Sequence, residues 1–229
     1  MEQVKEKETN KISNVRGKFK KFGGEKIDDI IEYIKEYVKE NPKVTISLGC
    51  DSVQRRRKTV YAFTLMFYSV SIRNGAHVIY FRENINKVRD NFDRLHKEAQ
   101  YVHEIGEFLQ RELEGKYFRK DLSEIERRKY KFHVAKCNGE YSHVSYNEDV
   151  VVQNISLSDH EKNTPFKLID LHVDFNPVEG KLDGRGFAKN RSNLSYKTYV
   201  PWLRGMGYRV FAKPAAHCAT SAADLLLKD

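Results

Sequence analysis

The sequence has little cysteine and proline and no long apolar run. Its 229 residues include three cysteines, which are widely spaced and form no CxxC pair. A disulfide framework is therefore not expected, and a reducing cytoplasm fits the composition. No apolar run reaches the roughly 18 residues that a membrane-spanning helix needs, and the first residues lack the apolar stretch of a secretory signal. These absences predict a cytoplasmic protein with no membrane contact.

The motifs of several enzyme classes are also missing. The sequence contains no Walker A loop, no GxSxG nucleophile elbow and no HExxH metal motif. His133, Cys137 and His143 could ligate a metal, but no fourth partner lies at zinc-like spacing. The sequence thus argues against a P-loop nucleotide hydrolase, an α/β serine hydrolase and a zinc site.

Positive charge is in excess. Lysine and arginine number 41 against 32 aspartates and glutamates, which gives a formal net charge of +9. Hydrophobic residues make up 40% and aromatic residues 12%, enough for a packed core. A basic folded protein often binds nucleic acid, although solubility alone would also account for the charge.

Apolar residues recur every three to four positions in several segments, which predicts amphipathic helices. The segments are 25–41, 89–115, 194–207 and 215–228. Pro42 and Gly115 are suitable ends for the first two, whereas Pro201 lies inside the third. The last segment is rich in alanine and follows Pro214, a residue that the first turn of a helix tolerates.

Five segments rich in β-branched and aromatic residues predict strands. They are 44–52, 58–72, 75–84, 166–177 and 208–213. Short connections join the first three, with Asn74-Gly75 marking one turn, so these strands should be antiparallel. Helices separate the later strands, which should be parallel. The expected fold is α/β: a mixed five-stranded sheet, three antiparallel strands and then parallel ones, flanked by helices.

The domain organisation follows from charge and regularity. Residues 1–24 are basic and predict a mobile N-terminal arm, and residues 25–229 form the expected domain. The charge-rich, irregular tract 116–165 interrupts this domain before the fourth strand. We expect it to be an insertion that holds one or two strands and a short helix and that could contact a protein partner.

Four acids stand out by position. Asp51 ends the first strand, Asp174 ends the fourth, Glu98 lies beside the apolar stripe of the long helix, and Asp224 lies on the closing helix. Each alone could be a solvated surface acid or a helix cap, and none has an obvious cation at helical spacing on the same face.

The two strand-end acids should meet. If the first and fourth strands are neighbours, Asp51 and Asp174 converge, and like charges that close need a cation between them. Magnesium or manganese prefers such oxygen ligands. Two such ions could activate water and stabilise the leaving oxygen of a phosphodiester.

Three stretches resemble the ribonuclease H-like superfamily and, more closely, its YkuK-type branch of predicted ribonuclease H-related proteins. They are "SLGCDSVQ" at 47–54, "LHVDFNP" at 171–177 and "YRVFAKPAAHCATSAAD" at 208–224. The resemblance covers residues 25–110 and 166–229 and implies a ribonuclease H-like fold with the insertion 116–165 outside it.

The resemblance also implies a metal site. One acid each comes from the first strand, the first long helix, the fourth strand and the final helix, here Asp51, Glu98, Asp174 and Asp224. Asp51 would bridge two Mg²⁺ or Mn²⁺ ions, and the four acids would be both the metal ligands and the catalytic residues. Glu104 and Glu107 compete with Glu98 because they share its helix, and Asp170 competes with Asp174.

Basic residues near these acids are candidates for binding phosphates. Arg55, Arg56, Arg57 and Lys58 follow the first strand at an expected hairpin tip, Lys189 and Arg191 lie in a glycine-rich loop, and Lys213 follows the last strand. A solvated turn is the alternative for the hairpin run, and Lys213 could pair with an acid instead.

The sequence therefore predicts a metal-dependent nuclease that cleaves RNA, RNA–DNA hybrid or structured DNA. Two other functions stay open: a nucleic-acid-binding module without catalysis, and a protein-interaction adaptor that uses the 116–165 insertion. The type of nucleic acid, and whether cutting is internal or terminal, also stay open.

Overall fold

The protein is built around one mixed sheet, seen in a computed structural model that describes residues 15–41, 44–69, 76–113, 136–137, 140–141, 167–177, 192–213 and 215–228. The strands are β1 (Lys20–Lys21), β2 (Val44–Gln54), β3 (Lys58–Ser69), β4 (Ala76–Asn86), β7 (Ile169–Val173) and β8 (Val210–Ala212). Their order is β1-β4-β3-β2-β7-β8. The three long strands are antiparallel, and β7 and β8 continue parallel to β2. The predicted mixed five-stranded sheet is confirmed, with the short edge strand β1 as a sixth member.

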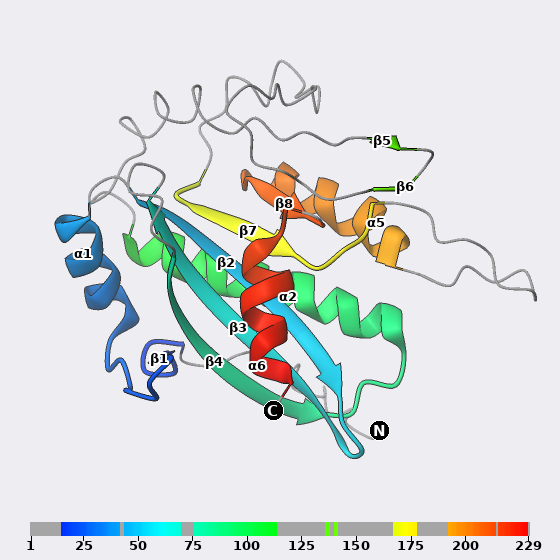
Figure 1. Cartoon of the computed structure of the whole chain (residues 1–229), viewed down its shortest axis with the longest axis horizontal. Coiled ribbons are helices and arrows are strands. Elements are labelled where there is room, and N and C mark those ends of the chain that lie inside the picture. The colour runs from blue at the N-terminus through cyan, green and yellow to red at the C-terminus, as the bar shows by residue number, and fades with distance from the viewer. Residues whose placement is uncertain are drawn as a thin grey trace, which may run out of the picture.

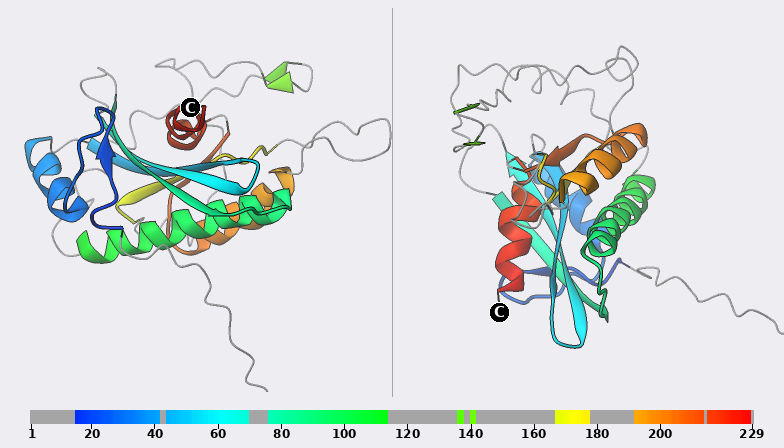
Figure 2. Two further views of the ribbon diagram at one scale, coloured as in Figure 1. Left: turned by 90° about the horizontal axis from the view of Figure 1, so that it is seen from below. Right: turned by 90° about the vertical axis from the view of Figure 1, so that its right-hand side faces the viewer.

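Helices cover both faces of this sheet (Figures 1 and 2). One face carries α1 (Ile30–Glu40), α2 (Asn91–Leu113) and α5 (Ser192–Gly205), and the other carries the π-helix η1 (Cys218–Ala223), which continues into α6 (Asp224–Leu227). Strand alternation assigns the two faces: Leu171 packs under Gly106 of α2, whereas Gly49 packs under Ala219 of η1. Asp51, two positions beyond Gly49 on the same strand, therefore faces the η1–α6 side.

Helices α1 and α2 are shorter than their sequence patterns, whereas α5 has the predicted length and begins two residues earlier than its pattern at 194–207. The pattern at 25–41 begins five residues before α1, because the Asp29 side chain accepts a hydrogen bond from Ile31 N at 2.8 Å and caps the helix there. Pro201 does lie inside α5, in its last turn and a half, where the side chain is exposed. Helix α2 matches its prediction within two residues at each end.

The closing segment differs from its prediction, because it is a π-helix before it is an α-helix. It lies very close to β2: a Cβ added at Gly49 would meet Ala219 N at 2.6 Å. The buried side chains of the sheet hold its first turn, with Cys218 N donating to His172 Nδ1 at 3.1 Å and Thr64 Oγ1 donating to Cys218 O at 2.7 Å. These contacts are made across the sheet, so local periodicity could not reveal the wider helix.

Part of the predicted N-terminal arm is packed on the sheet. Phe19 is fully buried and stacks edge-on against Phe81, and β1 pairs with β4 through Lys20 and Tyr80. Residues 15–24 are thus packed on the sheet and are not part of a mobile arm. The sequence pattern did not reveal this packing, because the apolar residues Val15 and Phe19 are surrounded by basic residues. Residues 1–14 lie outside the described part of the chain.

Little of the predicted insertion 116–165 is described. Two short strands, β5 (Lys136–Cys137) and β6 (Glu140–Tyr141), pair with each other in a separate sheet. The rest of the tract, with His133 and His143, lies outside the described residues, as does the predicted turn at Asn74-Gly75. Among the helices that the structure describes, none has the length and apolar character to cross a bilayer.

Candidate functional site

Asp51 and Asp174 lie side by side at the edge of the sheet where its parallel strands end. Strands β2 and β7 pair in parallel, and the last matched pair is Cys50 with Val173. Asp174 is the first residue after β7, as predicted, whereas the prediction that Asp51 ends its strand is wrong, because β2 continues to Gln54. The two acids follow the last matched pair, so they are about one strand spacing apart, roughly 5 Å between backbones. Ligands of open α/β sheets bind at this carboxyl edge. The predicted convergence of these two acids is therefore what the sheet register produces.

Asp51 is a largely buried carboxylate without an ion pair to any described residue. Its Oδ1 accepts a hydrogen bond from Ser52 N at 2.7 Å. The Asp51 pKa is raised from 3.8 to about 6, chiefly by burial and also by the negative charges of Asp174 and Asp224, against the hydrogen bond from Ser52 and the positive charge of Arg94. The ionised form of Asp51 is thus only partly compensated by the described part of the protein, through the Ser52 amide and the more distant charge of Arg94.

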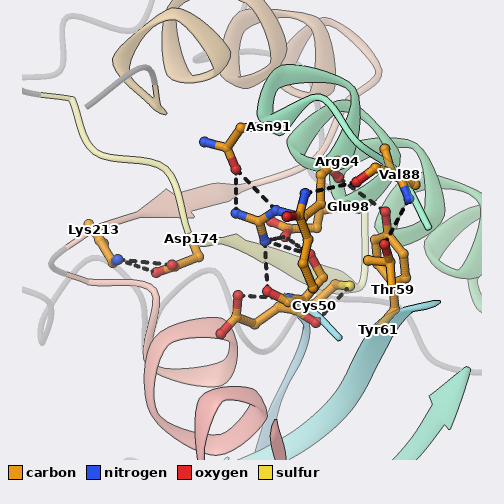
Figure 3. A network of polar contacts seen from close by, with 12 residues as sticks. Cys50, Thr59, Tyr61, Val88, Asn91, Arg94, Glu98, Asp174 and Lys213 are labelled. Atoms are coloured by element: carbon orange, nitrogen blue, oxygen red, sulfur yellow. Dashed lines mark hydrogen bonds and ion pairs between the residues drawn. The ribbon is translucent and has the colours of Figure 1, made fainter. Parts of the chain in front are cut away.

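Glu98 lies beneath this pair, on α2, with 1% of its surface exposed. Its Oε1 accepts hydrogen bonds from Ser52 Oγ and from Arg94 Nη1, the latter at 3.0 Å (Figure 3). Its Oε2 is buried and has no hydrogen-bond partner among the described residues. Burial raises the Glu98 pKa well above its ordinary value, and the charge of Asp51 adds to this shift.

The remaining two acids each contact a lysine. Lys213 Nζ lies 2.8 Å from Asp174 Oδ1 and 2.9 Å from Oδ2 (Figure 3). Burial nevertheless raises the Asp174 pKa, because Lys213 offsets only part of it. Asp224 Oδ2 lies 2.7 Å from Lys228 Nζ, and its side chain is 44% exposed. Asp224 is close enough to raise the pKa of both Asp51 and Asp174.

The expectation that no cation lies at helical spacing was wrong for two of the four acids. Arg94 is four residues before Glu98, and Lys228 is four residues after Asp224, and both pairs are in contact. Spacing of four residues is the ordinary arrangement for an ion pair on a helix. Both spacings can be read directly from the sequence, so the sequence carried this signal.

The competing acids have other partners. Glu107 pairs with Lys167 and accepts a hydrogen bond from the Tyr208 hydroxyl at 2.7 Å. Glu104 accepts from the Gln100 amide at 2.9 Å. Asp170 is held by Arg209 through both carboxylate oxygens. The geometry therefore favours Glu98 over its helix neighbours and Asp174 over Asp170.

The predicted nucleic-acid-binding residues fall into four groups. Arg56, Arg57 and Lys58 are exposed at the β2–β3 hairpin tip. Arg55 Nη2 instead donates to Leu227 O at 2.6 Å and so holds the end of α6. Lys213 pairs with Asp174. Pairing with an acid was one of its two predicted roles, and binding phosphate was the other. Lys189 and Arg191 lie outside the described residues.

The donor chemistry of the site suits a hard divalent cation. Its candidate ligands are all carboxylates, three of which have raised pKa values, and Glu98 Oε2 is buried with no hydrogen-bond partner in the part of the chain that is described. Within the described ranges, no group of three or more His, Cys, Asp or Glu side chains is already arranged to hold a metal ion. The residues fit such an ion in kind, and the lysine contacts at Asp174 and Asp224 would have to open to admit it.

Three residues that hold the site in place were not predicted from the sequence: Ser52, Arg94 and His172. Ser52 and Arg94 connect β2 to Glu98, since Arg94 Nη1 donates to both Ser52 O and Ser52 Oγ at 2.6 Å. Position 52 follows Asp51 and faces α2 by strand alternation, which the sequence pattern implied. His172, which receives the first amide of η1, had no comparable local signal.

The fold and site define a class: an α/β protein with an acidic centre at the carboxyl edge of the central strands of a mixed sheet. The family model described as Ribonuclease H-like matches residues 26–228, and the chain belongs to this family. No curated protein and no solved structure matches the chain. The YkuK-type branch stays a prediction.

Proposed function

We propose that the protein is a metal-dependent nuclease that hydrolyses phosphodiester bonds of RNA, RNA–DNA hybrid or structured DNA. Asp51, Glu98, Asp174 and Asp224 would be the ligands of two Mg²⁺ or Mn²⁺ ions. The observation that carries the proposal is the placement of Asp51 directly beside Asp174 at the sheet edge, with the Asp51 pKa raised to about 6. A purely structural acid pair would be expected to have a cation between its members.

Each side chain has a distinct part in this proposal. Asp51 presents its carboxylate from the centre of the sheet, and the Ser52 amide fixes its orientation. Arg94 and Ser52 hold Glu98 Oε1, which leaves Oε2 available. Divalent ions bound here would supply an activated water and stabilise the leaving oxygen. Lys213, once released from Asp174, is near enough to donate to a substrate phosphate.

The charge distribution supports a polyanionic substrate. The chain carries a net charge of +9, whereas the site itself is acidic. The basic protein attracts a phosphate backbone at long range, but the carboxylates repel it at the site. Such a substrate can bind at the site only if cations neutralise these acids. The cytoplasm is the compartment that the cysteine content favours for this activity.

A second function is a nucleic-acid-binding module without catalysis. It is favoured by the contacts of Arg94, Lys213 and Lys228 with three of the four acids. In that case these cations would neutralise the acids permanently, and the basic surface alone would bind nucleic acid. A protein adaptor that uses residues 116–165 is a third possibility, and it concerns a tract that lies mostly outside the described residues.

Cleavage assays separate these functions. Fluorescent single-stranded RNA, RNA–DNA hybrid and branched DNA would be incubated with Mg²⁺ or Mn²⁺, with Asp51→Asn as the test variant and Asp28→Asn, an exposed acid before α1, as the matched control. The nuclease proposal expects metal-dependent cleavage by wild type and control and none by Asp51→Asn. Binding without cleavage under all metal conditions would support the module instead.

A further inference from the structure

Five exposed cations gather at one end of the sheet from two separate segments. Arg56, Arg57 and Lys58 come from the hairpin between β2 and β3, and Lys87 and Arg89 come from the connection between β4 and α2. Lys58 pairs with Asn86 across the β3–β4 ladder, so the two segments are neighbours. We name these five residues the basic platform. None of them forms an ion pair with a described residue.

The platform is held rigidly by contacts that do not use its charges. Gln54 Nε2 donates to Val88 O at 2.8 Å, and Val88 N donates to Thr59 Oγ1 at 2.9 Å. Arg55 ties the other side of the hairpin to Leu227 O at 2.6 Å. Asp90, the nearest acid in the connection, accepts from the amides of the first turn of α2. The five cations are therefore positioned by neighbours while their charges stay available.

The conformation of the β2–β3 hairpin turn does not explain why arginines occupy its two central positions. Arg55 N donates to Lys58 O at 2.8 Å, which makes Arg56 and Arg57 the two central residues of a tight hairpin. Two-residue hairpin turns strongly favour asparagine, aspartate and glycine at these positions. Two arginines at the most projecting point of the sheet instead suit a partner with closely spaced negative charges (Figures 1 and 2).

The position of the platform relative to Asp51 sets what it can reach. The chain reverses at Arg56 and Arg57, so the hairpin cations lie level with the fourth and fifth positions beyond Asp51, which is about 13 to 17 Å of extended strand. One nucleic-acid strand rises about 3.4 Å per nucleotide, so this distance corresponds to about three to six nucleotides. The spacing fits a substrate that is bound well beyond the bond at the acidic centre.

We propose that the basic platform binds the phosphodiester backbone of a nucleic acid on one flank, about three to six nucleotides from the bond held at Asp51. The inference rests on the proposed function for the identity of that bond, but binding by the platform does not need cleavage. Lys87 and Arg89 belong to this surface as much as the hairpin arginines do, and Arg55 does not, because its guanidinium is engaged by α6.

Equilibrium binding in EDTA tests the platform without cleavage. Fluorescence anisotropy would follow a labelled RNA–DNA hybrid and a labelled single-stranded RNA. The test variants are Arg56→Ala/Arg57→Ala and Lys87→Ala/Arg89→Ala. The matched control is Lys26→Ala/Lys39→Ala, which removes two exposed cations around α1. We expect each platform pair to raise Kd about tenfold, because two phosphate contacts are lost, and the control less than about twofold.

The salt dependence identifies the contact as one to phosphate. Each platform pair should reduce the slope of log K against log salt by about 1.8 on a duplex or about 1.4 on a single strand. Equal losses in platform and control variants would mean a general charge effect and would overturn the proposal. Binding of anionic lipid vesicles, with no binding of either oligonucleotide, would also overturn it.

A second measurement tests the distance. Neutral methylphosphonates placed about three to six nucleotides to one side of the cleaved bond should weaken binding by wild type but not by the platform variants. If methylphosphonates weakened binding only next to the cleaved bond, the proposed position of the platform on one flank of that bond would be wrong. If wild type cleaves but the platform variants bind normally, the platform proposal fails while the nuclease proposal stands. If the platform variants lose binding and wild type cleaves no substrate, the nuclease proposal fails while the platform proposal stands.

Discussion

Lys213 Nζ lies 2.8 Å from Asp174 Oδ1, in the place where a ligand of Asp174 would be expected. The side chains are 42% and 19% exposed, so the pair is only partly shielded from water. Lys213 and a metal ion therefore compete for the same carboxylate. This competition makes Lys213 a direct test of whether Asp174 is a metal ligand.

Lys213→Met should strengthen Mn²⁺ binding. A partly exposed ion pair contributes up to about 1 kcal/mol, so we expect Kd for Mn²⁺ to fall by about two- to fivefold, measured by isothermal titration calorimetry without substrate. Lys197→Met, at an exposed position on α5, is the control. An unchanged or weaker Mn²⁺ affinity in Lys213→Met would show that Asp174 does not take up the metal.

Asp51→Asn should stabilise the metal-free protein. Because the Asp51 pKa is raised from 3.8 to about 6 in the folded state, folded protein binds more protons than the unfolded chain between these values. The free energy of unfolding consequently falls as pH rises through this window, and the loss persists above it. In EDTA near pH 8, Asp51→Asn should gain up to about 3 kcal/mol in urea unfolding, and the gain should vanish below about pH 4.

The same variant should respond less to metal. Wild type should gain thermal stability from Mn²⁺ above about pH 6, where Asp51 is ionised, and Asp51→Asn should gain much less. Asp28→Asn is the control, because the Asp28 side chain is exposed. If wild type and Asp51→Asn showed equal stability in EDTA at all pH values, the buried charge at Asp51 would be compensated by the protein.

Arg94→Met should destabilise the protein most at alkaline pH. It would leave the buried Glu98 carboxylate without its cation, a change that costs about 3 kcal/mol or more when the charge is retained. Protonation of Glu98 relieves this cost, so the destabilisation should shrink as pH falls. Urea unfolding across pH measures it, with Arg111→Met, an exposed position on the same helix, as control. A pH-independent loss would assign Arg94 to packing alone.

Gly49→Ala should displace the π-helix. Its Cβ would lie 2.6 Å from Ala219 N, a backbone atom that cannot move alone. We expect a loss of about 1–3 kcal/mol in unfolding free energy and weaker Mn²⁺ binding, since Asp224 directly follows η1. Gly23→Ala is the matched control, because a Cβ there has nothing within 4 Å. Equal stability of the two variants would mean that η1 can shift without cost.

The local patterns of the sequence were sufficient for the element order. Periodicity and short connections predicted the three antiparallel strands, the long helix α2 and the later parallel strands, because each pattern is complete within a few residues. The same patterns placed Asp174 correctly at the end of a strand, but they ended the first strand too early, because β2 continues three residues beyond Asp51 to Gln54. The edge strand β1 was missed, since two lysines give no strand signal and only pairing with β4 makes them a strand.

The sequence by itself determined the mixed sheet, the excess of positive charge and the four acids from which the site is drawn. Only the tertiary structure decided which acids stay available: Asp170 is held by Arg209, 39 positions away, whereas Asp51 forms no ion pair with a described cation. It also decided that Arg55 supports α6 and that Gly49 admits a π-helix. The physical reason is that charge pairing and close packing depend on distances between segments, which sequence periodicity does not contain.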